Sequence, residues 1–233
     1  MAFRPIRMIF ALWLATAGAL QAQTGPVVVE LFTSQGCSSC PPADALLTKL
    51  ADREDVIALA LHVDYWDYIG WADTFGDPAN TLRQKAYARA ANKRMIYTPQ
   101  IIVGGRDHVV GHEEDNVNRL LAENAARPVA VALTLERVSE SLQISAGPAP
   151  QGTGEMDVQL VRYIPEQTVS IRRGENAGRD IVYSNIVTSW QLLRKWDGKS
   201  PLSISATVQG DEPVVVILQQ SGNGPIVAAA RLR

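Results

Sequence analysis

The sequence predicts an α/β domain followed by an all-β, sandwich-like domain, and two observations lead to this division. Before residue 127, nearly continuous apolar runs alternate with segments whose apolar residues have helical spacing, which is the pattern of a β-α-β unit. After Arg127-Pro128, apolar residues recur at every second position, and turns rich in glycine and proline separate the short runs. We therefore expect one domain at residues 23–126 and a second at residues 127–233.

Residues 1–22 have the pattern of a secretory signal peptide. Arg4 and Arg7 precede a short apolar stretch at residues 8–20, and small residues follow it. The stretch is too short for a comfortable membrane span, so we expect cleavage rather than an uncleaved anchor, and no stable span afterwards. A periplasmic or secreted location would place the protein in an oxidising compartment, where a disulfide persists.

The charge of the chain argues against two classes of partner. Removal of residues 1–22 leaves 20 basic and 24 acidic residues. Nucleic-acid-binding proteins and polybasic membrane anchors carry an excess of positive charge instead. We therefore expect no nucleic-acid partner and no electrostatic membrane attachment.

The first domain is expected to be organised around the only two cysteines of the chain, Cys37 and Cys40. A β-branched apolar run at residues 27–32 predicts a buried strand before them, and Pro41-Pro42 predicts a helix that starts directly after them. The free N–H groups and the positive end of the helix dipole stabilise a thiolate at such a position. Two cysteines separated by two residues can open and close a disulfide, with Cys37 attacking and Cys40 resolving the mixed disulfide.

Other chemistry is less consistent with this C-x-x-C pair. Zinc needs four ligands, and no further cysteine exists to complete a cluster, while haem attachment requires a histidine where Pro41 stands. A structural disulfide that closes so short a loop would stabilise little. A copper(I) site of Cys37, Cys40 and one histidine is a further alternative, although His62 is better interpreted as a packed core residue. We expect no metal and no organic cofactor.

An aromatic and aspartate-rich segment at residues 64–77 is predicted to be a loop. Its residues Trp66 and Trp71 form either a cover on the sheet or an aromatic wall beside the cysteines that receives a partner polypeptide. Asp77-Pro78 has the pattern of an N-cap followed by a first helical residue. A strand after Pro99, a Gly-Gly hairpin and a closing helix complete the domain.

Short strands are predicted throughout the second half. They are expected at Leu142–Ser145, Met156–Tyr163, Thr168–Arg172, Leu202–Val208, Val214–Gln219 and Ile226–Ala230. Residues 181–196 fit either a strand or a helix. The polar, glycine-broken loop at residues 172–179 is interpreted as a charged turn rather than as a site for an anion.

Two motifs carry a resemblance to known proteins: G-C-S-S-C-P-P at residues 36–42 and Y-T-P-Q-I-I-V-G-G at residues 97–105. Together with the order of predicted elements, they resemble a thioredoxin-like domain. More narrowly, the chain resembles a secreted bacterial family catalogued as domain of unknown function 1223. H-V-D-Y-W-D at residues 62–67 and G-E-N-A-G-R at residues 174–179 extend this resemblance over most of the mature chain.

The resemblance implies roles for three further residues. It implies that the Thr98–Pro99 bond is cis, that Pro99 faces the disulfide, and that the Thr98 backbone pairs with an extended partner segment. It also implies that Glu30 is a buried acid that moves the proton of Cys40, the alternative being an acid that faces solvent or caps an element. Ser38-Ser39 between the cysteines differs from thioredoxin itself and leaves the redox direction open.

The leading interpretation is a periplasmic or secreted thiol–disulfide oxidoreductase. Its partner would be an extended segment of a thiol- or disulfide-containing protein. The alternative is a non-enzymatic secreted binding protein, or the copper chaperone, in which the disulfide is inert.

Overall fold

The computed structural model describes residues 25–233. The signal peptide predicted at residues 1–22 lies outside the described residues. Within the described part, the chain forms three α-helices, a short 3₁₀ helix and eleven strands. The helices are α1 (Pro41–Ala51), α2 (Pro78–Ala90) and α3 (Glu114–Ala125), with the 3₁₀ helix η1 at Asp67–Ile69. The strands are β1 (Val27–Thr33), β2 (Val56–His62), β3 (Gln100–Val103), β4 (Asp107–Val110), β5 (Leu133–Val138), β6 (Ser141–Ala146), β7 (Met156–Ser170), β8 (Asp180–Trp196), β9 (Leu202–Thr207), β10 (Val214–Gln220) and β11 (Ile226–Leu232).

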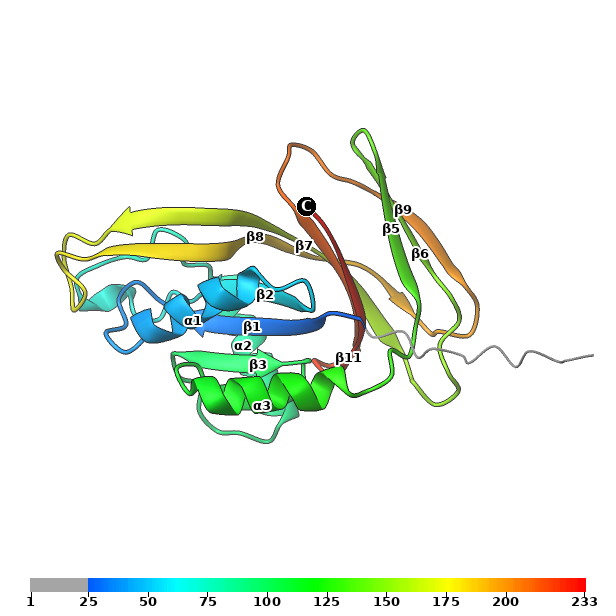
Figure 1. The fold of residues 1–233 in the computed structure, drawn as a ribbon, viewed down its shortest axis with the longest axis horizontal. Coiled ribbons are helices and arrows are strands. Elements are labelled where there is room, and N and C mark those ends of the chain that lie inside the picture. Colours follow the sequence, from blue (N-terminus) through cyan, green and yellow to red (C-terminus); the bar gives the residue numbers. More distant parts are fainter. Residues whose placement is uncertain (1–24) are drawn as a thin grey trace, which may run out of the picture.

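Most strands belong to one mixed sheet of eight strands in the order β11-β10-β7-β8-β2-β1-β3-β4 (Figure 1). β1 and β2 run parallel, and α1 makes the crossover between them, as the alternating pattern predicts. β8 lies parallel to β2 and joins it at Ala60 and Ile186. A second sheet, with the order β5-β6-β9, packs at the far end of the molecule.

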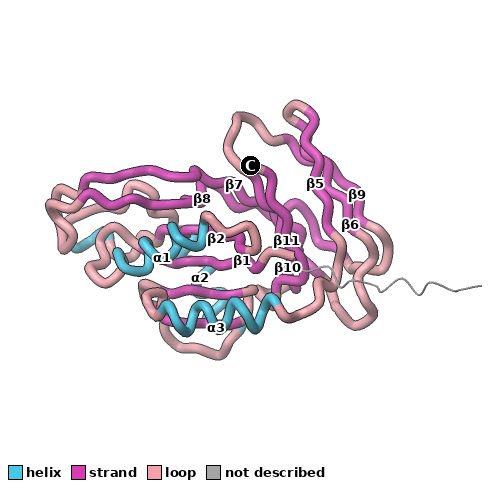
Figure 2. The backbone as a smooth tube through the Cα atoms, viewed as in Figure 1, coloured by secondary structure: helices cyan, strands magenta, loops and turns pink. Residues whose placement is uncertain are grey.

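The predicted fold class, an α/β thioredoxin-like domain followed by an all-β domain, is wrong. β7, β8, β10 and β11 come from the second half and continue the sheet that β1 to β4 begin, so the described chain is mostly β (Figure 2). The apolar patterns correctly indicate strands in both halves, and residues 181–196, which fitted either a strand or a helix, form part of β8. They indicate which faces are buried, however, and not which strand lies beside which. Whether residues 23–126 fold without the rest stays a prediction.

Two apolar clusters lie on opposite faces of the first strands because alternate side chains of a strand point to opposite sides. On one face, Val29 and Leu31 pack with the apolar residues of α1 and α3. On the other face, Val28 and Phe32 pack with Tyr87 of α2 and with side chains from the second half of the chain. A third cluster fills the space between the two sheets.

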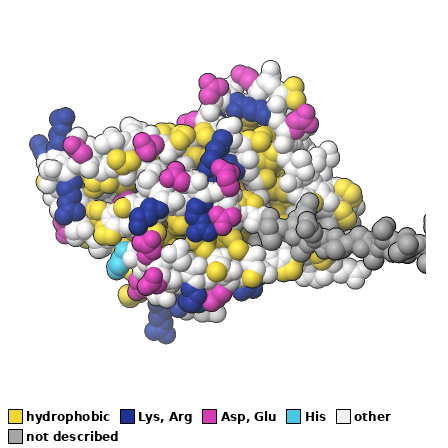
Figure 3. All heavy atoms as spheres, viewed as in Figure 1, with side chains coloured by type: hydrophobic (Ala, Val, Ile, Leu, Met, Phe, Trp, Pro, Cys, Tyr) yellow, Lys and Arg dark blue, Asp and Glu magenta, His cyan; other side chains and the backbone are white. Residues whose placement is uncertain are grey.

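The surface is mixed in charge on the face drawn in Figure 3, where basic and acidic side chains lie interspersed with small apolar areas. Among the described helices, none combines the length and the apolar composition that crossing a membrane requires.

The shared core predicts that a fragment of residues 25–126 is less stable than residues 25–233. The fragment would lose Val161 and Ile217, which share an apolar cluster with Phe32 and Ile57 in the intact chain. We expect a loss of several kcal/mol, because burial of one such side chain contributes about 1.5–3 kcal/mol. Urea denaturation of the two chains measures the difference. Equal unfolding free energies would instead support an independent domain that ends near residue 127.

Candidate functional site

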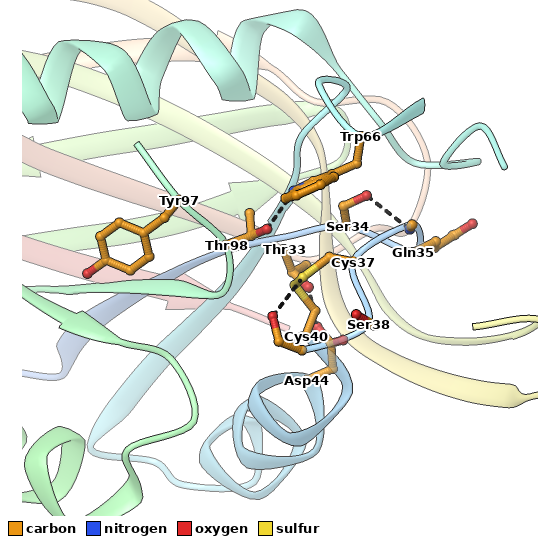
Figure 4. Close-up of a disulfide and its surroundings, with 12 residues drawn as sticks. Thr33, Ser34, Gln35, Cys37, Ser38, Cys40, Asp44, Trp66, Tyr97 and Thr98 are labelled. Carbon is orange, nitrogen blue, oxygen red and sulfur yellow. Dashed lines mark hydrogen bonds between the residues drawn. A yellow bond between two sulfur atoms is a disulfide. The ribbon is translucent and has the colours of Figure 1, made fainter. Parts of the chain in front are cut away.

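Cys37 and Cys40 form a disulfide at the start of α1, with their Cα atoms 5.4 Å apart (Figure 4). Cys40 is the N-cap residue of the helix, and its carbonyl accepts hydrogen bonds from the amides of Ala43 and Asp44 at 2.8 and 3.1 Å. Pro41 and Pro42 occupy the first helical positions, where a missing N–H costs no helical hydrogen bond. The predicted placement of the cysteines between a strand and a helix N-terminus is confirmed.

The disulfide lies just below the surface. Cys37 is 3% exposed and Cys40 is fully buried, whereas Ser38 and Ser39 between them are exposed. The Ser39 hydroxyl lies 3.3 Å from the Cys37 sulfur, and it must be the donor because a disulfide sulfur carries no hydrogen. Cys37 is thus slightly more exposed than Cys40, although an attacking thiolate has little access to either residue.

Trp66 and Thr98 form one side of the site, as Figure 4 shows. The Trp66 indole donates a 2.7 Å hydrogen bond to the Thr98 hydroxyl, and Tyr68, which is 80% exposed, stacks on the Trp66 ring. The Thr98–Pro99 bond is cis, as the resemblance implied. These contacts connect the loop at residues 64–77 with the segment before β3.

Pro99 packs beside the first turn of α1. A Cβ atom added to Gly111 would lie 3.0 Å from the Pro99 Cβ and 3.1 Å from the Cβ of Ala43, so the three residues meet closely. The small size of Gly111 therefore lets Pro99 approach the helix that begins at the disulfide.

Trp71 supports the disulfide loop instead of joining Trp66 in a wall. Its indole donates a 2.8 Å hydrogen bond to the side-chain oxygen of Gln35, which is fully buried. The backbone amide of Gln35 in turn donates to the Asp73 carboxylate at 2.8 Å. The loop before Cys37 is thus held through Gln35.

Glu30 is buried, but the structure does not bring it to Cys40. Its carboxylate accepts hydrogen bonds from Arg83 at 2.6 and 3.0 Å and from the Tyr87 hydroxyl at 2.5 Å. These partners belong to α2, on the face of the sheet opposite to α1. The Arg83 guanidinium also lies over the Trp190 ring at 3.7 Å from its centre. Glu30 is thus one half of a buried ion pair.

Asp44 is the acid that lies near Cys40, and sequence reasoning missed it. It stands four residues after Cys40, one turn along the same helix, and accepts a 2.7 Å hydrogen bond from the Thr33 hydroxyl. Burial raises the pKa of the Asp44 carboxyl from 3.8 to about 7, and the nearby His62 and the Thr33 hydrogen bond oppose this only in part. An aspartate on the apolar side of the first turn, beside Leu47, was the available signal.

A buried polar cluster extends from Asp44 to His62, Asp73 and Tyr183. His62 Nδ1 lies 2.8 Å from the Asp73 carboxylate, and the ring centres of His62 and Tyr183 are 4.9 Å apart. One oxygen of Asp44, His62 Nε2 and the Tyr183 hydroxyl are buried and have no hydrogen-bond partner within residues 25–233. No group of three or more residues suited to hold a metal ion is found in that range. Buried polar groups without a partner are rare in native proteins, and a redox or catalytic role is one explanation for them.

The loop at residues 172–179 touches the disulfide loop, which periodicity could not indicate. The Asn176 side chain donates hydrogen bonds to the carbonyls of Gln35 and Cys37 at 3.0 and 2.9 Å. The Glu175 carboxylate accepts from the Ser38 amide at 3.2 Å. The site is therefore assembled from both halves of the chain.

Comparisons with known proteins identify relatives. A family model described as a protein of unknown function, DUF1223, matches residues 28–219, which bears out the family resemblance of the motifs. The crystal structure of protein AGR_C_4864 from Agrobacterium tumefaciens is 36% identical, with a TM-score of 0.77 over 91% of this chain and 96% of that chain. HBP35 of Porphyromonas gingivalis is 15% identical, with a TM-score of 0.59 over 90% of this chain and 75% of that chain, and shares the fold alone. No curated protein matches the chain.

The position of Asp44 predicts a pH-dependent stability. Its raised pKa means that the folded protein binds this proton more readily than the unfolded chain, so stability is lost as the pH rises from about 4 through about 7. Asp44→Asn removes the cost of ionisation. We expect the unfolding free energy of the variant to exceed that of the unsubstituted protein by a difference that grows from pH 4 to pH 8, up to about 4 kcal/mol.

Denaturant titrations of the oxidised proteins at pH 4, 6 and 8 measure this gain. Asp211→Asn, at an exposed position, controls for the loss of one negative charge. A constant difference between Asp44→Asn and the unsubstituted protein at all three pH values would contradict the assignment.

The buried pair of Glu30 and Arg83 predicts a structural effect without a redox effect. Arg83→Ala leaves a buried carboxylate unpaired and should destabilise the protein by about 3–5 kcal/mol. Arg119→Ala breaks an exposed pair with Glu123 and should cost about 0.5 kcal/mol or less. Denaturation measures both values, and alkylation of the reduced protein should show that Glu30→Gln leaves the reactivity of Cys37 unchanged.

Proposed function

We propose that this chain, which belongs to the DUF1223 family, is a thiol–disulfide oxidoreductase with Cys37 as the attacking and Cys40 as the resolving cysteine. The observation that carries the proposal is the disulfide at the N-terminus of α1, with a buried acid one helical turn away. We place its action in an oxidising compartment, the periplasm or the outside of the cell.

The reaction follows from the position of each sulfur. The Cys37 thiolate attacks a partner disulfide, and the displaced partner sulfur leaves as a thiolate. The Cys40 thiol then loses its proton and attacks the Cys37 sulfur, which breaks the mixed disulfide and releases the second partner sulfur as a thiolate. The partner disulfide is reduced as the Cys37–Cys40 bond forms, and the reverse sequence oxidises a partner dithiol.

Three groups support these steps. The amides and dipole at the start of α1 favour the Cys37 thiolate, and the Ser39 hydroxyl lies within reach of the same sulfur at 3.3 Å. Asp44, with a pKa of about 7, is about half ionised at neutral pH, and its ionised form can accept the proton of Cys40. This role replaces the one that the resemblance implied for Glu30, whose carboxylate is bound by Arg83.

An extended partner segment would lie along Thr98. Neither the amide nor the carbonyl of Thr98 has a hydrogen-bond partner within residues 25–233, although its hydroxyl is held by Trp66. Free backbone groups beside a sheet pair readily with an incoming extended chain. The exposed Tyr68 on Trp66 would add apolar contact with the partner.

One observation favours the second candidate, a binding protein with an inert disulfide. Both cysteines are almost completely buried, at 3% and 0% exposure. A buried bridge exchanges slowly because the attacking thiolate must reach a sulfur. The two candidates differ in whether a mixed disulfide forms.

Single-cysteine variants test the proposal. We expect Cys40→Ala to form a stable mixed disulfide with a one-cysteine peptide supplied as its glutathione disulfide, because no resolving thiol remains. Cys37→Ala should form at least about tenfold less adduct because Cys40 is buried beneath the loop. Mass spectrometry before and after dithiothreitol measures the adduct.

The Pro99→Ala variant, made in the Cys40→Ala background, should change the rate of adduct formation while the protein stays folded by circular dichroism. If neither single-cysteine variant forms an adduct, and the reduced and oxidised proteins are equally stable, the binding-protein candidate replaces the oxidoreductase.

A further inference from the structure

The hairpin tip, residues 171–179 between β7 and β8, reaches the disulfide loop from the second half of the chain. Its base is closed by hydrogen bonds from the Ile171 amide to the Arg179 carbonyl at 2.9 Å and from the Gly178 amide to the Ile171 carbonyl at 2.8 Å. Ile171 is buried, so the tip is anchored and does not project freely. Figure 1 shows β7 and β8 extending along the sheet to bring this tip toward the start of α1.

Asn176 makes the central contact of the hairpin tip. It is 1% exposed, and its Nδ2 donates to the Gln35 and Cys37 carbonyls at 3.0 and 2.9 Å. The two carbonyls determine the orientation of the amide, because a flipped side chain would set its oxygen against two other oxygens. The Asn176 oxygen has no hydrogen-bond partner within the described chain, so the two donated bonds are what hold this side chain.

Two neighbours of Asn176 reinforce the contact. Glu175 accepts a 3.2 Å hydrogen bond from the Ser38 amide, between the cysteines. Gly174 has a φ of +75°, and a Cβ atom there would lie 3.2 Å from the Cβ of Trp71, whose indole holds Gln35. The hairpin tip therefore contacts the disulfide loop before, at and after Cys37.

We propose that Asn176 is a positioning residue that sets the redox equilibrium of the Cys37–Cys40 pair by holding the disulfide loop closed. This inference deepens the proposed thiol–disulfide exchange and names the element that controls it. In exchange with glutathione, the Cys37–Cys40 bond forms as the glutathione disulfide breaks, and the two protons of the dithiol pass to the two glutathione thiolates.

The direction of the effect follows from the difference between the two redox states. The covalent bond keeps the loop in the geometry that Asn176 binds, whereas the reduced loop is free to relax away from it. The hydrogen bonds then stabilise the oxidised protein more than the reduced protein. By linkage, this difference in free energy is the amount by which they favour the disulfide. Loss of the contact should make the pair easier to reduce.

Equilibration of the purified chain with mixtures of reduced and oxidised glutathione tests the proposal. Asn176→Asp keeps the size of the side chain but removes both donors and sets a carboxylate against two carbonyls. We expect the equilibrium constant for disulfide formation to fall about three- to tenfold. A tenfold fall corresponds to about 30 mV. Quantifying thiols by alkylation and mass spectrometry gives the constant.

The matched control is Asn185→Asp on β8. Asn185 is also buried, at 6% exposure, and its Nδ2 donates to the Ala58 carbonyl at 2.8 Å, away from the cysteines. Aspartate tolerates its left-handed backbone, with φ of +50°, about as well as asparagine does. This variant should lose stability without changing the redox equilibrium.

Substitutions of Glu175 give an independent test that does not touch the buried side chain. Glu175→Ala loses the contact with the Ser38 amide and should shift the equilibrium in the same direction by about two- to threefold. Glu175→Gln keeps an acceptor and should behave as the unsubstituted protein does. Because Glu175 is exposed, these proteins should fold even if Asn176→Asp does not.

Linkage provides a second readout. Asn176→Asp should lower the unfolding free energy more in the oxidised than in the reduced protein. The difference between the two losses should equal the free-energy change that corresponds to the shift in redox equilibrium. Equal destabilisation in both states, with an equilibrium within twofold of the unsubstituted protein, would overturn the inference. That result is distinct from failure of the proposed function, which is the absence of mixed disulfides with the peptide probe.

Discussion

The pairing of β8 with β2 is the constraint on which the arrangement of the site depends. The two strands meet at Ala60 and Ile186. β8 thereby enters the sheet next to the strand whose end carries His62. The hairpin that β8 forms with β7 is then directed along the sheet toward the start of α1. A local strand–helix junction thus becomes a site built from both halves of the chain.

The disulfide loop is held in place mainly through Gln35, which is fully buried. Its amide, its side chain and its carbonyl are bound by Asp73, Trp71 and Asn176 in turn. These contacts come from segments that follow the loop at very different distances along the chain. Once the sheet has formed, bringing these segments together costs little additional conformational entropy. A loop held in this way keeps Cys37 and Cys40 in place at the start of α1, with their Cα atoms 5.4 Å apart.

The two buried acids near β1 have different partners because they lie on opposite sides of the sheet. Glu30 meets a guanidinium and is neutralised as half of an ion pair, a role that fits structural support. Asp44 meets a hydroxyl and a histidine but no permanent cation, and burial therefore raises the pKa of its carboxyl to about 7. The same class of side chain thus forms a buried ion pair on one face and has a raised pKa on the other.

The sequence by itself determined the local features of the site. The apolar run before Cys37 and the prolines after Cys40 place the pair at a helix start, because strand burial and helix initiation depend on adjacent residues. Only the tertiary structure decided that second-half strands extend the first sheet and that Glu30 pairs with Arg83. It alone placed Asn176, 139 residues along the chain, on the Cys37 carbonyl. Periodicity reports which side of an element is buried, whereas the identity of the covering residue depends on packing between distant segments.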